Sequence, residues 1–83
     1  MKNSEITDEQ IRSIYKKIGE NVKKEREKKG MSQLHLALAI GHNSVSTVSM
    51  SERCLQNKHF NIEHLVKIAN VLGVNICKFF EGI

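Results

Sequence analysis

Proline and tryptophan are absent from this 83-residue sequence, and aromatic side chains make up only 5% of it. Few clusters of β-branched or aromatic residues are left to build strands, so the composition favours helices over sheet. Hydrophobic residues at 40% and charged residues at 27% are typical of a globular protein. We therefore predict an all-α fold, and a chain this short is expected to form one compact core.

Long apolar runs are also missing. No stretch approaches the roughly 20 apolar residues that a membrane span needs, and the amino terminus has no apolar signal region. Cys54 and Cys77 lack C-x-x-C spacing, and the four histidines have no regular metal-ligand spacing. We expect a cytoplasmic protein that uses no membrane, no metal and no cofactor.

Charge is absent from one long window. Residues 31–51 contain no Lys, Arg, Asp or Glu, whereas residues 1–30 hold nine basic and six acidic residues. The net charge of +4 suits a polyanionic partner but is common among small domains. The uncharged window must therefore pack inside the protein or contact another molecule.

Capping residues and glycines divide the chain into helices. Thr7 and Gln10 form a capping box before the first helix, and Gly30 ends it. Gly19 lies inside this helix, where a break is possible because glycine disfavours helix. The helix carries one apolar stripe, formed by Ile11, Ile14, Tyr15, Ile18 and Val22.

Four shorter helices are predicted to follow. Their expected caps are Ser32, then Asn43 or Ser44, then Asn61 and Asn75. The second helix, residues 33–40, is apolar nearly all round and is expected to be largely buried. The predicted inward faces of the third and fourth helices are Val45, Val48, Glu52 and Leu55, and Ile62, Leu65, Ala69 and Leu72. The fifth helix carries one apolar stripe that is either core or a dimer contact, formed by Ile76, Phe79, Phe80 and Ile83.

The second and third helices are short and joined by a tight turn at Gly41, as in a helix-turn-helix. In that motif the later helix enters the DNA major groove and the earlier one braces it across the backbone. We expect Gln33, Asn43 and Lys58 to hold phosphates. The candidate base-reading side chains are Ser44, Ser46, Thr47, Met50 and Arg53.

The order of several motifs resembles the Cro/CI repressor (XRE) family. The residues that carry the resemblance are Ser32-Gln33, Leu36-Ala37, Ile40-Gly41, Val48-Ser49, Glu52 and the run Asn61-Ile62-Glu63-His64-Leu65 through Ile68-Ala69 to Leu72-Gly73-Val74. The resemblance covers roughly residues 18–80, with Cys54 where the family usually has glycine. It implies a five-helix lambda-repressor-like domain that binds double-stranded DNA, usually as a homodimer, to control transcription.

We accordingly divide the chain into an amino-terminal helical extension, residues 1–17, and a DNA-binding domain, residues 18–83. Within that domain, an ion pair between Arg26 and Glu52 is predicted. At about 100° per residue, Arg26 lies at the edge of the face that carries Ile18 and Val22, so its charge needs a partner. Glu52 is the only acidic residue between positions 28 and 62 and falls on an inward face. The family resemblance implies the same pair.

Alternatives concern both assembly and function. The dimer surface is either the fifth helix, with Ile76, Phe79, Phe80 and Ile83, which we favour, or the amino-terminal arm, with Ile11, Ile14 and Tyr15. The fold can also serve as a protein-interaction module, because the third helix has little charge and Leu34 and Leu38 occupy positions that the family usually exposes. No residue arrangement typical of a catalytic site stands out, so we expect neither an enzyme nor a small-molecule substrate.

Overall fold

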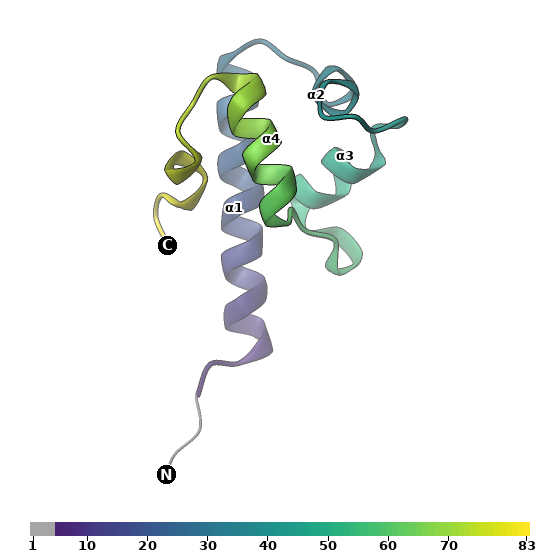
Figure 1. Cartoon of the computed structure of the whole chain (residues 1–83). Helices are drawn as coiled ribbons and strands as arrows, with labels where there is room; N and C mark the ends of the chain where they lie inside the picture. Colours follow the sequence, from purple (N-terminus) through teal and green to yellow (C-terminus); the bar gives the residue numbers. More distant parts are fainter. Residues whose placement is uncertain (1–4) are drawn as a thin grey trace.

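The computed structural model describes residues 5–83, and the first four residues of the predicted extension lie outside it. The elements are α1 (Asp8–Lys28), α2 (Gln33–Ala39), α3 (Ser46–Arg53), η1 (Leu55–Asn57), α4 (Ile62–Leu72) and η2 (Ile76–Phe80), where η denotes a 3-10 helix. No strand occurs in this part of the chain, in agreement with the predicted all-α class. In Figure 1, α1 is the long axis, with α2 and α3 on one side of it and η2 on the other.

Local side-chain caps begin three of the helices as the sequence predicts. The Thr7 hydroxyl accepts from the N–H of Gln10 at 3.1 Å, and the Gln10 side chain accepts from the N–H of Thr7 at 2.7 Å. Asn61 and His64 form the same reciprocal pair at the start of α4. Ser32 caps α2 by accepting from the N–H of His35 at 3.0 Å. These caps satisfy backbone donors that a helix start would otherwise leave unpaired.

The first helix passes through Gly19 without a break. A Cβ atom on Gly19 would lie 2.5 Å from the carbonyl oxygen of Ser51 and 2.6 Å from that of Glu52. Glycine is therefore needed because the last turn of α3 approaches the backbone of α1 at this point. The boundary that we expected between residues 17 and 18 falls inside the same continuous helix.

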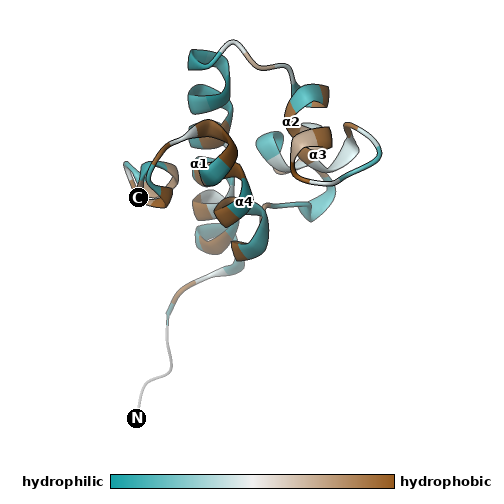
Figure 2. Cartoon of the chain, turned by 45° about the horizontal axis from the view of Figure 1, so that its top comes forward, coloured by the Kyte–Doolittle hydropathy of each residue, from teal (hydrophilic) through white to brown (hydrophobic). Residues whose placement is uncertain are grey.

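One apolar core lies where α1, α2, α3, α4 and η2 meet. Its residues are Ile18, Val22, Leu36, Ala37, Ile40, Val48, Phe60, Leu65, Ile68, Ala69, Leu72 and Phe79. Figure 2 shows apolar turns on α2, α3 and α4, whereas the carboxyl end of α1 is mainly hydrophilic. No helix within residues 5–83 is both long enough and apolar enough to cross a membrane.

The predicted fifth α-helix is instead the five-residue 3-10 helix η2. The Asn75 side chain caps it, accepting from the N–H of Cys77 at 2.8 Å. Phe79 is buried in the core, whereas Phe80 is exposed, so the two rings do not share one face. The side-chain amide of Asn21 fixes η2 to α1 by donating to the carbonyl of Phe79 at 3.0 Å and that of Glu81 at 2.9 Å.

Three predicted inward positions are wrong: Val45, Leu55 and Ile62 are all exposed. Val45 precedes the first turn of α3, and Leu55 follows Cys54, whose left-handed backbone ends that helix. Helical periodicity therefore does not extend to Leu55, whereas Val45 has helical backbone angles but lies at the exposed amino-terminal end of α3. Ile62 begins α4, where no segment of the described chain covers it, and its exposed fraction is 66%.

The expectation that α2 is largely buried is also wrong. Leu36 and Ala37 lie in the core, but Leu34, Leu38 and Ala39 are exposed. A seven-residue helix can turn only one face toward its neighbours, so an apolar residue on the other face stays in contact with solvent.

Candidate nucleic-acid interface

The turn between α2 and α3 is closed by backbone hydrogen bonds at the end of α2. The N–H of His42 donates to the carbonyl of Ala37 at 2.9 Å, and the N–H of Gly41 donates to that of Leu38 at 3.1 Å. Gly41 has a φ of 94°, a conformation that favours glycine. This turn directs the chain from α2 into α3, as a helix-turn-helix requires.

The start of α3 differs from the prediction that Asn43 or Ser44 caps it. The N-cap residue is Val45, which makes no side-chain capping hydrogen bond. Ser44 contributes from one position earlier, because its hydroxyl accepts from the N–H of Ser46 at 3.4 Å. Asn43 and Ser44 are both exposed in the turn.

The third helix separates its side chains into a buried face and an accessible face. Val48, Ser51 and Glu52 are buried, whereas Ser46 and Arg53 are exposed. The residues of intermediate burial are Thr47, Ser49 and Met50. The predicted base-reading side chains of α3 therefore belong to its accessible face.

A buried ion pair holds α3 against α1. The Arg26 Nε atom lies 2.7 Å from Glu52 Oε2, and Arg26 Nη2 lies 3.1 Å from Glu52 Oε1, so the contact is bidentate. The exposed fractions of the two side chains are only 8% and 0%. Arg26 Nη1 also donates to the carbonyl of Met31 at 2.7 Å, and Met31 lies in the segment that leads into α2. The pair thus fixes both helices of the motif on α1.

The Gln33 side chain belongs to this network rather than standing free for a phosphate. Its Nε2 atom donates to Glu52 Oε1 at 2.9 Å, and the side chain is partly buried. Sequence reasoning missed this bond, because it joins α2 to α3 and no local pattern signals it. The contact ties the start of α2 to the inner face of α3.

The segment after α3 brings Lys58 to the surface. Cys54, Gln56 and Asn57 have φ values of 54°, 52° and 60°, all in the left-handed region. The N–H of Lys58 donates to the carbonyl of Leu55 at 2.8 Å, which closes the bend. In Figure 1 this bend and the α2–α3 turn project on the same side of α1.

Further basic side chains border α3 at its carboxyl end. Lys16 and Lys23 of α1 line a shallow pocket together with Arg53. Glu20 and Glu52 line the same pocket, so the local charge is mixed. No local sequence pattern places Lys16 or Lys23 beside α3, since their proximity depends on the packing of α1 against α3.

Comparison with known proteins relates this geometry to a family. The chain matches the helix-turn-helix family over residues 22–79, which is more than half of its length. The chain belongs to this helix-turn-helix family. Membership in this XRE-type family identifies a DNA-binding transcriptional regulator.

A solved relative of this helix-turn-helix protein is the restriction-modification controller protein C.AhdI from Aeromonas hydrophila. The two chains are 26% identical and superpose with a TM-score of 0.72, and the match covers 82% of this chain and 98% of that chain. A search of the curated proteins found no match to the chain.

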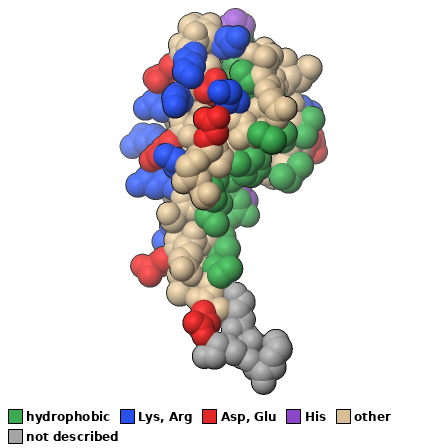
Figure 3. Space-filling model, turned by 90° about the vertical axis from the view of Figure 1, so that its left-hand side faces the viewer, with side chains coloured by type: hydrophobic (Ala, Val, Ile, Leu, Met, Phe, Trp, Pro, Cys, Tyr) green, Lys and Arg blue, Asp and Glu red, His purple; other side chains and the backbone are tan. Residues whose placement is uncertain are grey.

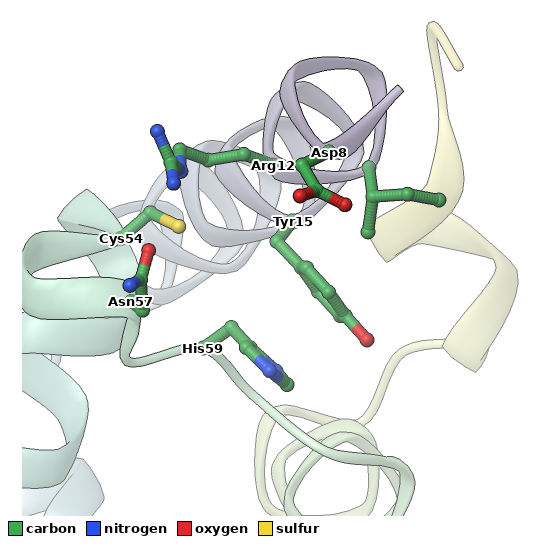
Figure 4. Close-up of a pocket in the computed structure, with 7 residues that line it drawn as sticks. Asp8, Arg12, Tyr15, Cys54, Asn57 and His59 are labelled. Atoms are coloured by element: carbon green, nitrogen blue, oxygen red, sulfur yellow. The ribbon is translucent and has the colours of Figure 1, made fainter. Parts of the chain in front are cut away.

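The family match begins at Val22, so residues 8–21 of α1 lie outside it, and these include the whole first half of the helix. That half contacts the bend after α3 through Tyr15, whose ring stacks on His59 with centroids 3.6 Å apart and planes 13° apart. Figure 4 shows both rings at a pocket of about 310 Å³ between α1 and η1, with Asp8 and Arg12 on the α1 side. Across residues 5–83, no group of three or more His, Cys, Asp or Glu side chains is placed to hold a metal ion.

Proposed function

We propose that this helix-turn-helix protein is a repressor that binds a near-palindromic site in double-stranded DNA as a homodimer. The observation that carries the proposal is the accessible polar face of α3, held by a buried ion pair and preceded by a closed turn. The later helix of such a motif enters the major groove. The likeness to a restriction-modification controller protein supports a regulatory role.

The proposed base contacts come from Ser44, Ser46, Thr47, Met50 and Arg53. Serine and threonine hydroxyls can donate to or accept from base edges, and the Thr47 methyl suits the methyl group of thymine. Arg53 is the long donor of this set and is exposed. A two-fold dimer would place its two α3 helices about 34 Å apart, one turn of DNA, and would therefore read a palindrome.

The proposed phosphate contacts come from Asn43 and Lys58, which are exposed on either side of α3 in the sequence. Gln33 keeps a phosphate role only if its amide exchanges Glu52 for DNA, because the amide already donates to that carboxylate. Phosphate contacts fix the position of a protein on DNA without reading the sequence.

Selection of bound sequences from random duplex DNA tests the proposal most directly. Enrichment of a palindromic site is expected, and binding should weaken steeply with added salt because phosphate neutralisation releases counterions. A pool that stays random after selection would contradict sequence-specific binding. Repression is then checked with a reporter whose promoter overlaps the selected site.

Two classes of mutant should separate phosphate contacts from base contacts. Lys58→Ala should weaken binding to all duplexes alike and lower the salt slope by about one, whereas Ser46→Ala with Thr47→Ala should change the preferred sequence. Lys67→Ala on α4, where Lys67 pairs with Glu63, is the matched control and should change neither. An unchanged sequence preference in the double mutant would refute the assignment of α3.

A second candidate function is a protein-interaction module with weak DNA binding. Leu34 and Leu38 favour it, because they lie one turn apart on the exposed side of α2. Replacing both with serine should leave DNA affinity unchanged if the protein acts on DNA alone. Absence of DNA binding even at low salt would favour this second candidate.

A further inference from the structure

The apolar stripe of α1 is covered in one half of the helix and uncovered in the other. The exposed fraction rises from 5% at Ile18 to 38% at Ile14 and 42% at Ile11, with Tyr15 intermediate. These residues recur at helical spacing, so they form one ridge on one face. The ridge therefore continues beyond the part of α1 that the chain's own core covers.

A groove opens beside this ridge, between α1, α4 and η2. It has a volume of about 260 Å³, and its walls include Tyr15, Ile18, Ile62, Leu65 and Phe80. Ile62, Val66, Phe80 and Ile83 leave further apolar surface exposed on α4 and in the carboxyl-terminal segment. Figure 3 shows apolar side chains in a band that descends from the body of the molecule along the projecting part of α1.

We propose that this band, the exposed part of the stripe together with the groove, binds the same band of a second copy. The proposal rests on the homodimer of the proposed function and names its interface. In this arrangement Ile11 and Ile14 of each copy pack against the other copy at the mouth of its groove. A surface that carries both a ridge and a groove can satisfy a two-fold axis, in which one patch must complement itself.

The size of the band supports a protein partner. Its exposed apolar residues are Ile11, Ile14, Ile62, Val66, Phe80 and Ile83. Together they expose an area on the order of several hundred Å², at the upper end of what a monomer leaves in contact with water. Counted on both copies, an interface of this extent approaches the roughly 1,000 Å² expected of a specific dimer.

The charged side chains of this part of α1 lie beside the band rather than on it. Asp8 and Arg12 line the pocket that faces η1, and Lys16 lines the pocket at the carboxyl end of α3. The surface offered to the second copy is therefore mainly apolar, as the centre of a homodimer interface usually is.

The arrangement also joins the two dimer surfaces that the sequence left as alternatives. Tyr15 of the amino-terminal arm and Phe80 of η2 line the same groove, so arm and η2 belong to one surface. Phe79 takes no part in it, because its ring is buried in the core.

Sedimentation velocity over a concentration series tests the surface. Ile14→Asp on the ridge and Ile62→Asp on the groove should each raise the dimer dissociation constant by about tenfold or more. Both residues are exposed, so circular dichroism should show unchanged helix content. Leu38→Asp, at an equally exposed apolar residue on α2, is the matched control and should leave the dissociation constant unchanged.

The outcomes separate this proposal from the proposed function. A chain that stays monomeric at every concentration, or an unchanged dissociation constant in Ile14→Asp, would overturn the proposed interface. If that protein still selects a DNA sequence, DNA binding stands without this interface. If the mutations weaken the dimer as expected but the protein enriches no DNA sequence, the interface stands and sequence-specific DNA binding is refuted.

Discussion

The two halves of α1 carry the same apolar stripe but are held by different contacts. In the second half, Gly19 lets the backbone of α3 approach, and Arg26 pairs with buried Glu52. In the first half, the contact with the bend after α3 is the stack of Tyr15 on His59. A periodic apolar stripe therefore indicates that a face will be covered, but not whether the same chain or another covers it.

The largest effect is expected from separating Arg26 and Glu52. Arg26→Met alone and Glu52→Leu alone should each lower the free energy of unfolding by about 3–5 kcal/mol, because each leaves an unpaired charge in the core. The double mutant should recover much of the loss, since two apolar side chains need no partner. Urea titration of the three variants measures these differences.

The matched control is the surface pair of Glu63 and Lys67, at 2.9 Å. A hydrogen bond from Lys67 and its charge lower the pKa of Glu63, but both side chains are largely exposed, so Lys67→Met should hardly change stability. Near-neutral single mutants at Arg26 and Glu52 would show that the buried ion pair contributes no more to stability than the surface pair does.

Gly19→Ala tests the close packing in the second half of α1 by adding a single methyl group. The added Cβ would overlap the carbonyl oxygens of Ser51 and Glu52, so α1 and α3 must separate, at an expected cost of about 3 kcal/mol. Ser13→Ala, in the exposed first half of the same helix, should be neutral or slightly stabilising. The melting temperatures of both variants, measured by thermal unfolding, test this expectation. Equal melting temperatures would rule out a close approach of α1 and α3.

The features that the sequence predicts well are local or follow from one helix face. Thr7, Ser32 and Asn61 cap helices because their side chains reach backbone donors only a few residues away. The structure also brings Arg26 and Glu52 together, the two charges that helical geometry turned inward. The family resemblance, which depends on motifs in order, agrees with the match over residues 22–79.

The features that the sequence does not reveal depend on contacts between distant segments. The close approach at Gly19 involves backbone atoms of α3, which have no sequence signature. The bond from Gln33 to Glu52 turns a candidate phosphate ligand into a structural contact for the same reason. Helical spacing also fails where the backbone stops being helical, as at Leu55 beyond left-handed Cys54.

A smaller effect is expected in the first half of α1. Tyr15→Ala removes the ring that stacks on His59 and should lower the free energy of unfolding by about 1 kcal/mol, measured at a concentration where the protein is monomeric. Hydrogen exchange should quicken in residues 8–17 and stay unchanged in residues 20–28. Tyr15→Phe keeps a stacked ring and should behave as the wild type, so a matching loss in that variant would assign the effect to the hydroxyl.

The smallest effect concerns His64, just after the segment on which Tyr15 stacks. Burial, and then the positive charge of His42, lower the pKa of His64, while Glu63 opposes them. His64 Nδ1 accepts from the N–H of Asn61 at 3.1 Å, which requires this nitrogen to be unprotonated. As pH falls below about 6.5, the unfolded chain takes up a proton that the folded chain resists, so stability should decline until the lower folded pKa is reached.

His64→Gln can keep the cap without the titration, and its urea midpoint should fall less between pH 7 and 5 than that of the wild type. His35→Gln, on the exposed side of α2, is the control, and the same pH response in all three proteins would exclude His64 as the cause.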